Sequence, residues 1–285
     1  MADIKTVGIV GAGQMGAGIA HVSAVAGYDV LFHDISPDRI EAGRAAVARN
    51  LGRQVAKGIV TQEAMDAALA RIRPAETVEA VAKADLVIEA ATENEETKKA
   101  IFRSLAPHVG PETLLASNTS SISITRLASV TAHPEKFIGL HFMNPVPIMK
   151  LVEVIKGLGT SKETTERTIA LATAMGKSPL PANDRPGFVS NRVLMPMINE
   201  AFYAWMEGVA EPADIDGIMK LGCNFPMGPL NLADFIGLDT CVHIMDVLAE
   251  GLNNDRYRAC PLLKQLVTAG RLGVKSGRGV FEYQK

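Results

Sequence analysis

The chain has 285 residues, of which 47% are hydrophobic and 21% are charged, and its formal net charge is −2 at pH 7. This length fits one large domain or two ordinary ones, and the composition permits a sizeable buried core. The nearly balanced charge argues against nucleic acid or an anionic membrane as a partner.

Cysteines and apolar runs indicate the compartment. The three cysteines, Cys223, Cys241 and Cys260, include no CxxC pair, so we expect no disulfide framework, no metal site and a reducing environment. The first ten residues lead directly into a strand-like stretch without a signal or transit segment. No apolar run approaches the roughly 20 residues of a membrane helix. We therefore expect a cytoplasmic protein.

The N-terminal segment predicts a βαβ unit. Thr6–Val10 is β-branched and bounded by glycine, which predicts a buried strand. A helix over Gln14–Ala26 ends at Gly27, and a second strand over Val30–His33 closes on Asp34. Two strands joined through a helix predict a parallel sheet with a right-handed crossover.

The next segment predicts a helical arm over about residues 36–70. Ser36–Val60 is typical of one long helix, with Ser36 as its cap and Pro37 as its first residue. Thr61–Leu69 predicts a second, antiparallel helix. Such an excursion exceeds what a minimal dinucleotide fold needs, so we interpret it as an arm that reaches over a substrate.

Strands and helices then alternate again before the pattern changes. We expect strands at Leu86–Glu89, Thr113–Ala116, Phe137–His141 and Leu151–Ile155. We expect helices at Glu95–Ala106, Ile122–Leu127 and Thr164–Met175. The proline-rich stretch 178–187 predicts a domain boundary. From Phe188 the chain is helical and Met-rich, with little strand signal before Val280–Tyr283. The sequence thus predicts an α/β domain over 1–183 and an all-helical domain over 184–285.

A glycine-rich turn follows the first predicted strand. It is a G-x-G-x-x-G motif formed by Gly11, Ala12, Gly13, Gln14, Met15 and Gly16. A strand before it, a helix after it and an acidic residue after the second strand predict a Rossmann-like dinucleotide site. The Asp34 carboxylate would bind the adenosine ribose and repel a 2′-phosphate, which favours NAD over NADP. Arg39 lies nearby and softens that preference, although Asp38 counters it.

A histidine and a glutamate are spaced symmetrically about a proline-punctuated turn. His141 and Glu153 are equidistant from residue 147, so strands folded back there would place them opposite each other with Cβ atoms about 5 Å apart. A neutral imidazole can take the proton of an alcohol as hydride leaves the same carbon, and a carboxylate on its other nitrogen orients it. We interpret the pair as the acid/base of a dehydrogenase and assign no chemistry to the other histidines.

Three further features point to a substrate. Ser117 follows a strand, at the edge where open α/β sheets bind ligands, and suits a hydrogen bond to the substrate hydroxyl or carbonyl. The amide of Asn191 fits a carbonyl oxygen that gains charge, although a capping asparagine is an equal alternative. Arg49, Arg53 and Lys57 recur every four residues along the arm and suit coenzyme A phosphates. A merely solvated face is the commoner explanation for such a stripe.

Five motifs together resemble the L-3-hydroxyacyl-CoA dehydrogenase family, particularly its bacterial 3-hydroxybutyryl-CoA dehydrogenases. In order along the chain they are Gly-Ala-Gly-Gln-Met-Gly at 11–16, Ser-Asn-Thr-Ser-Ser at 117–121, His-Phe-Met-Asn-Pro-Val at 141–146, Asp-Arg-Pro-Gly-Phe-Val-Ser-Asn-Arg at 184–192 and Asn-Phe-Pro-Met-Gly-Pro-Leu at 224–230. The last two are long and highly specific, and the likeness extends over essentially the whole chain.

The resemblance implies NAD-dependent oxidation of a short-chain (S)-3-hydroxyacyl-CoA, or the reverse reduction. It implies that His141 is the base, that Glu153 orients it, and that Ser117 and Asn191 hold the reacting end of the substrate. It adds cofactor contacts at Glu93, Lys98, Ser117, Asn144 and, more weakly, Lys275. It adds coenzyme A contacts at Asn50, where some relatives have serine, and Lys57. It also implies a homodimer joined through the helical domain.

Two alternatives remain open from the sequence. A dehydrogenase of free 3-hydroxyacids would use a lysine as its acid/base, and both the histidine–glutamate pair and the arm argue against it. A non-catalytic NAD-binding protein would share the fold, because fold alone does not determine function. The sequence fixes neither the acyl chain length nor the physiological direction.

Overall fold

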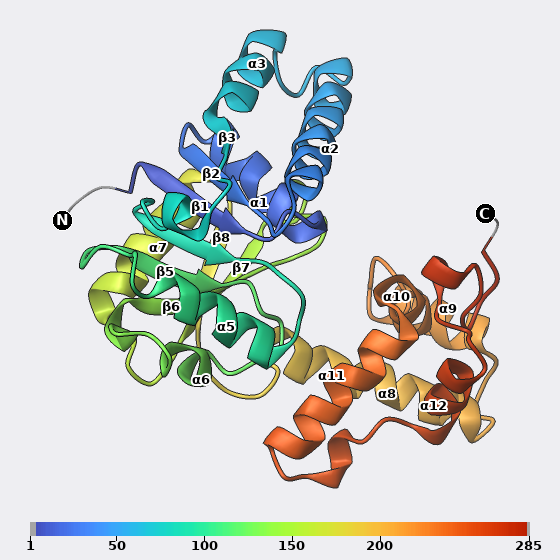
Figure 1. Cartoon of the computed structure of the whole chain (residues 1–285). Helices are drawn as coiled ribbons and strands as arrows, with labels where there is room; N and C mark the ends of the chain where they lie inside the picture. Colours follow the sequence, from blue (N-terminus) through green and yellow to red (C-terminus); the bar gives the residue numbers. More distant parts are fainter. Residues whose placement is uncertain (1–3, 284–285) are drawn as a thin grey trace. The chain divides into compact units, whose positions relative to one another are not determined.

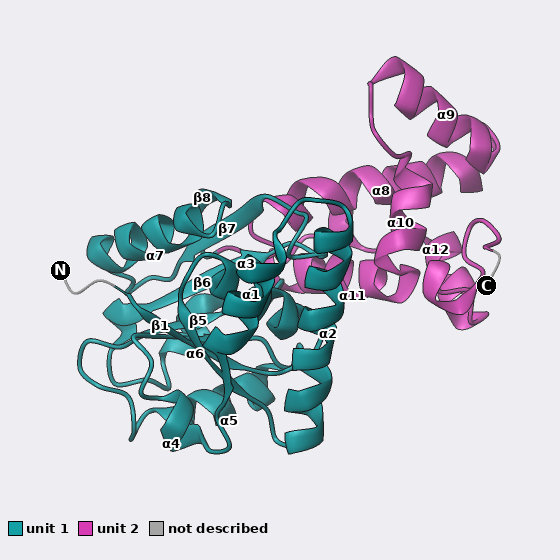
Figure 2. Cartoon of the chain, turned by 90° about the horizontal axis from the view of Figure 1, so that it is seen from above, with its two compact units in different colours: residues 1–184 teal, residues 185–285 magenta. Residues whose placement is uncertain are grey.

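The computed structural model describes residues 4–283 and divides them between two compact units, Met1–Asp184 and Arg185–Lys285 (Figure 2). The boundary expected from the sequence falls after residue 183. Each unit has its own hydrophobic core, the first built on a sheet and the second on helices alone.

Unit 1 is organised around one eight-stranded sheet in the order β3-β2-β1-β4-β5-β6-β7-β8. Its strands are β1 (Thr6–Val10), β2 (Asp29–His33), β3 (Ile72–Pro74), β4 (Leu86–Glu89), β5 (Leu114–Ser117), β6 (Phe137–Phe142), β7 (Leu151–Lys156) and β8 (Ser178–Asn183). All neighbours are parallel except β6 and β7, which pair antiparallel. The predicted Rossmann-like, mostly parallel sheet is confirmed.

Helices cover both faces of this sheet (Figure 1). They are α1 (Gln14–Val25), α2 (Pro37–Ala56), α3 (Gln62–Arg71), α4 (Val78–Val81), α5 (Glu95–Leu105), α6 (Ile124–Ala128) and α7 (Lys162–Ala174), with a 3₁₀ turn, η1 (Pro134–Lys136), before β6. Helices α1 and α7 share one apolar core with the strands, and α2 and α3 pack beside α1. Helices α4, α5 and α6 lie on the opposite face, where Phe102 meets Phe137 edge to face at 4.7 Å.

Strand β8 lies within the proline-rich stretch 178–187 and was not predicted from the sequence, although the boundary between the two units does fall in that stretch. Prolines at 179 and 181 suggested a turn, but residues 178–183 form a parallel edge strand on β7. The N–H of Ser178 donates to the carbonyl of Lys150, just before β7, and the N–H of Asp184 donates to that of Lys156 at its end. In this alternating pattern the two prolines occupy positions whose nitrogens face away from β7. An edge strand tolerates proline at those positions because no hydrogen bond is lost.

Unit 2 consists of helices. They are α8 (Ser190–Met206), α9 (Pro212–Gly222), α10 (Pro229–Ile236), α11 (Leu238–Gly251) and α12 (Pro261–Thr268), with 3₁₀ turns η2 (Asp255–Tyr257) and η3 (Val274–Ser276). The strand signal at Val280–Tyr283 was misleading, because this segment forms only an isolated bridge between Arg278 and Glu282. Its backbone is held instead by the buried Asp234 carboxylate, which accepts from the N–H groups of Val280 and Phe281.

Candidate active site

The functional side chains of unit 1 gather at one edge of the sheet. The parallel strands β1, β2, β4, β5 and β6 all end there, and the antiparallel β7 begins there. The glycine-rich loop follows β1, Asp34 follows β2, Ser117 ends β5 and His141 lies near the end of β6. This is the edge at which open α/β sheets bind their ligands.

The glycine-rich loop has the geometry that a dinucleotide requires. Gly11 has φ of +107°, and a Cβ on Gly16 would lie 1.7 Å from the Gly11 carbonyl oxygen, so neither position accepts a side chain without strain. A Cβ on Gly13 would meet nothing within 4 Å, so Gly13 borders open space at the start of α1. The first N–H groups of a helix lack intrahelical acceptors and suit a pyrophosphate. These residues fit NAD.

Asp34, directly after β2, lies beside the same loop. One carboxylate oxygen accepts the N–H of Ala12 at 2.7 Å and the other accepts the N–H of Ile35 at 2.8 Å. These bonds fix the carboxylate beside the glycine-rich loop, and each oxygen keeps a lone pair for a ribose hydroxyl. The exposed Arg39 guanidinium lies 3.9 Å from it.

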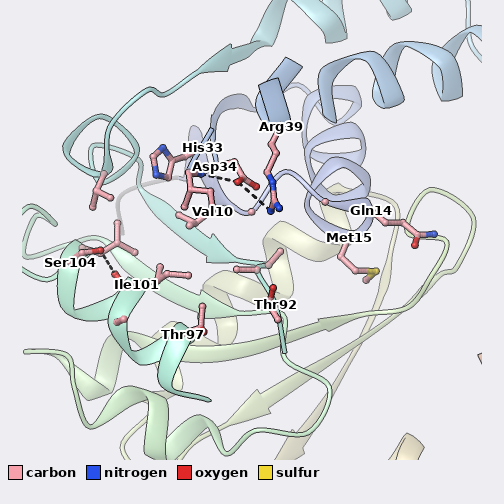
Figure 3. A pocket seen from close by; sticks show the side chains of 18 residues that line it. Val10, Gln14, Met15, His33, Asp34, Arg39, Thr92, Thr97, Ile101 and Ser104 are labelled. Atoms are coloured by element: carbon pink, nitrogen blue, oxygen red, sulfur yellow. Dashed lines mark hydrogen bonds and ion pairs between the residues drawn. The ribbon is translucent and has the colours of Figure 1, made fainter. Parts of the chain in front are cut away.

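A cavity of about 610 Å³ extends between these groups and α5. Figure 3 shows His33, Asp34 and Arg39 along one wall, Thr97, Ile101 and Ser104 along another, and Gln14 and Met15 at the far end. The lining is mostly apolar, as expected for the adenosine half of a dinucleotide. Among the predicted cofactor residues, Gly11, Gly13, Gln14, Met15 and Asp34 line it.

His141 and Glu153 are register partners across β6 and β7. The His141 Nδ1 lies 2.8 Å from Glu153 Oε2, and the side chains are only 10% and 4% exposed. The cross-strand position predicted from the spacing about residue 147 is confirmed. Because a carboxylate accepts, Nδ1 carries the proton, and in the neutral ring Nε2 then carries the lone pair.

A second buried carboxylate, Glu89 at the end of β4, was missed by the sequence analysis. Lys98 donates to its two oxygens at 2.8 and 3.0 Å, and both side chains are essentially inaccessible. Ser117 Oγ donates to Glu89 at 2.6 Å, and the N–H of Ala91 donates at 2.7 Å. Glu89 therefore ties β5 and α5 to β4. The sequence did offer a signal for Glu89, because this carboxylate ends an apolar strand in the same way that Asp34 follows β2.

Glu93 holds the Ser-Asn-Thr-Ser-Ser loop at the same edge. Its Oε1 accepts from Thr119 Oγ1 at 2.6 Å and from the backbone N–H groups of Ser120 and Ser121 at 2.8 and 3.1 Å, and its other oxygen lies 3.4 Å from Lys98. Burial raises the pKa of Glu93, but Lys98 and these hydrogen bonds outweigh it and hold the pKa below its ordinary value. The predicted residues Glu93, Lys98 and Ser117 thus belong to one network.

The turn between β6 and β7 is anchored at both ends. Asn144 Oδ1 accepts from Gln14 Nε2 at 3.0 Å, which joins two predicted cofactor residues. The buried Lys177 ammonium donates to the carbonyl oxygens of Val146 and Met149. Burial lowers the pKa of this amine. Lys177 therefore shapes the turn that carries Asn144.

The predicted coenzyme A residues lie on the arm. Arg49, Arg53 and Lys57 are exposed along α2 and its C-cap, and in the described part of the chain none of the three forms an ion pair. Asn50 is partly buried on the same helix. The arm packs on α1 through Val47 and Leu51. This packing holds α2, and with it the three basic side chains, in place on unit 1.

Two predicted site residues lie in unit 2. Asn191 is buried in the first turn of α8. Lys275 lies in η3, where its ammonium pairs with Asp239 at 2.5 Å.

Residues 4–283 contain neither a candidate metal site nor a candidate membrane-spanning helix. No group of three or more histidine, cysteine, aspartate or glutamate side chains is arranged to hold a metal ion. No helix in this range is long and apolar enough to cross a membrane.

A glycine-rich loop and carboxylate on a parallel sheet, with a buried histidine–glutamate pair at the same edge, define a dinucleotide-dependent oxidoreductase. Comparison with known proteins identifies the group. Residues 6–185 match the NAD-binding domain of 3-hydroxyacyl-CoA dehydrogenases, and residues 187–283 match their C-terminal domain. The chain belongs to the 3-hydroxyacyl-CoA dehydrogenase family, which confirms the resemblance drawn from the motifs.

Individual relatives extend the match to nearly the full length. A 3-hydroxybutyryl-CoA dehydrogenase of Bradyrhizobium diazoefficiens is 54% identical, covering 99% of this chain and 97% of that protein. The crystal structure of an (S)-3-hydroxybutyryl-CoA dehydrogenase from Ralstonia eutropha superposes with a TM-score of 0.97 at 50% identity, covering 99% and 100% of the two chains. A 3-hydroxyadipyl-CoA dehydrogenase of Escherichia coli is 44% identical over all of this chain but only 60% of its own length.

Proposed function

We propose that the protein interconverts (S)-3-hydroxybutanoyl-CoA and acetoacetyl-CoA with NAD(H), using His141 as acid/base and Glu153 to orient it. The observation that carries the proposal is the buried Nδ1–Oε2 hydrogen bond of 2.8 Å at the ligand-binding edge of the sheet. The names of the relatives support the four-carbon substrate.

The pair suits proton transfer to and from an alcohol. Glu153 fixes the tautomer in which Nε2 of a neutral ring accepts a proton, and its charge stabilises the imidazolium that forms. Bound NAD supplies the hydride acceptor. In the reverse direction His141 returns the proton to the oxygen of the ketone.

Ser117 contributes to binding in a more restricted way than its sequence position suggested. A hydroxyl has one proton, and Ser117 donates it to Glu89. Its oxygen therefore remains only as an acceptor, which suits the hydroxyl of the reduced substrate rather than the carbonyl of the oxidised one. The donor for that carbonyl is proposed to be Asn191, on the strength of its motif.

The arm is proposed to bind coenzyme A. Lys57 and Asn50 match positions at which the family contacts coenzyme A. The exposed side chains of Arg49, Arg53 and Lys57 suit the phosphates of coenzyme A. Asp34 is proposed to favour NAD over NADP, because its fixed carboxylate would repel a 2′-phosphate.

We also propose a homodimer joined through unit 2 in a reducing, cytoplasmic setting. Val209, Ile218 and Leu221 are 72%, 63% and 90% exposed on and beside α9, which is more apolar surface than a solvated helix usually carries. The three cysteines are unpaired, which fits reducing conditions. Light scattering at several protein concentrations tests the dimer.

Initial rates test the function. NADH oxidation should be fast with acetoacetyl-CoA, slower with 3-oxoacyl chains toward C16, and negligible with free acetoacetate. A preference for 3-oxoadipyl-CoA would move the substrate toward the E. coli relative. Activity on the free acid would favour the lysine-dependent class. Absence of turnover with every substrate would favour a non-catalytic role.

A further inference from the structure

His33, the last residue of β2, lines the cavity beside Asp34 (Figure 3). The sequence analysis gave it no chemistry because a histidine in a strand usually only packs. The side chain is anchored at one end: its Nδ1 lies 2.7 Å from the carbonyl oxygen of Ala75. A carbonyl has no proton to give, so Nδ1 is the donor and the neutral ring carries its lone pair on Nε2.

The other ring nitrogen has no protein partner. Within residues 4–283 the Ala75 bond is the only hydrogen bond of the His33 side chain, although the residue is 8% exposed. The Nε2 atom retains access to solvent, so in the free protein it can accept a hydrogen bond from water. In the neutral ring it is therefore an acceptor on the cavity wall, and a donor on a bound ligand can replace that water.

The neighbouring groups narrow the identity of this donor. Asp34 is positioned for the ribose hydroxyls, which leaves the base as the part of adenosine that meets His33. Val78 and Ile101 give the cavity apolar walls suited to a flat ring. Adenine has one group that donates hydrogen bonds away from the sugar, the 6-amino group.

We propose that His33 Nε2 accepts a hydrogen bond from the adenine 6-amino group, so that His33 reads the identity of the base in the dinucleotide. The assignment rests on the proposed use of NAD(H). It makes His33 a specificity residue for the cofactor, remote from the reacting carbon.

Nicotinamide hypoxanthine dinucleotide provides the matched probe. It carries a 6-oxo group, an acceptor, where NADH has the amino group, and its nicotinamide is unchanged. Fluorescence titration of the reduced forms at mildly alkaline pH should show NADH bound about threefold to tenfold more tightly, the value of one neutral hydrogen bond. Turnover at saturating cofactor should be the same with both, because hydride transfer involves only the nicotinamide.

Two substitutions separate the contact from the packing of the ring. In His33→Asn the side-chain amide can still donate to Ala75, but nothing replaces Nε2, so the preference for adenine should fall to within about twofold. In His33→Gln the longer amide places an oxygen near the position of Nε2, and part of the preference should return.

Ser104→Ala is the control, because Ser104 lines the same cavity and its hydroxyl already donates to Ile101. Its adenine preference should match the wild type. Equal affinity of the wild type for both dinucleotides, tighter binding of the hypoxanthine form, or an unchanged preference in His33→Asn would each overturn the assignment. Failure of the proposed function would look different, since neither dinucleotide would then support turnover.

Discussion

Two buried carboxylates, Glu153 and Glu89, lie at the same edge of the sheet but have different hydrogen-bond partners. Glu153 on β7 binds the imidazole of His141, whereas Glu89 on β4 binds the ammonium of Lys98, the hydroxyl of Ser117 and the N–H of Ala91. An imidazole is suited to accept and release a proton during a reaction, whereas the Lys98 ammonium compensates the buried charge of Glu89. The carboxylate of Glu153 is thus suited to the proposed acid/base chemistry, whereas that of Glu89 stabilises the surrounding edge of the sheet.

The different partners show how the buried negative charge of each carboxylate is compensated. A buried carboxylate needs compensation by a positive charge or by hydrogen-bond donors. Glu89 accepts four hydrogen bonds from three donor groups, those of Lys98, Ser117 and Ala91, so removing any one donor loosens the edge of the sheet. Glu153 accepts a hydrogen bond from Nδ1 of His141, so it determines which nitrogen of that ring keeps the lone pair.

The largest expected effect comes from removing the titratable partner. His141→Gln should lower kcat by about 10²–10⁴-fold, because an amide cannot take the proton of the alcohol. Binding of NADH, followed by fluorescence, should change by less than about threefold, because the adenosine site lies on β1 and β2. His133→Gln, at an exposed histidine paired with Glu135, serves as the control. Equal kcat in wild type and His141→Gln would refute the assigned base.

The second effect concerns stability rather than rate. Lys98→Met leaves the buried Glu89 charge without its cation and should cost about 3–5 kcal/mol of unfolding free energy. Adding Glu89→Gln removes that charge, and the amide can still bind both neighbours, because its oxygen can accept from the Ala91 N–H and its NH₂ group can donate to Ser117 Oγ. The double variant should therefore be more stable than Lys98→Met alone. Urea denaturation measures both.

The neighbouring Lys99→Met is the matched control for this cycle. Lys99 lies on the same helix but pairs with the partly exposed Glu95 at 2.7 Å, a contact usually worth under about 1 kcal/mol. If Lys98→Met were no more destabilising than Lys99→Met, Glu89 would not be a structural anchor.

The contrast also explains what the sequence could predict. The His141–Glu153 pair follows from symmetric spacing about one turn, a local feature of consecutive strands. The Glu89–Lys98 pair depends on how α5 packs over β4, and the accepting tautomer of His33 depends on a carbonyl 42 residues away. Strand β8 was not predicted for the same reason, because only its place at the edge of the sheet makes its two prolines acceptable.

A third carboxylate, that of Asp34, allows a test of whether a fixed negative charge determines the choice between NADH and NADPH. Asp34→Gly removes the carboxylate that is proposed to repel a 2′-phosphate, and it releases Arg39, which lies 3.9 Å away. The ratio of kcat/KM for NADPH to that for NADH should rise about tenfold or more, equivalent to about 1.4 kcal/mol. Combining Asp34→Gly with Arg39→Gln should remove most of this gain. An unchanged ratio in Asp34→Gly would show that the carboxylate does not govern cofactor choice.

The last prediction concerns Glu93, whose contribution to the free energy of unfolding should depend on pH. Its pKa is held below the ordinary value in the folded protein, so its ionisation stabilises the fold at neutral pH. That stabilisation is fully present above the unfolded pKa of about 4.3 and is lost as pH falls through the lower folded value. Glu93→Gln should therefore cost about 1–2 kcal/mol at neutral pH, and progressively less in acid. A stability difference that stayed constant down to low pH would mean that Glu93 holds its loop by shape rather than by charge.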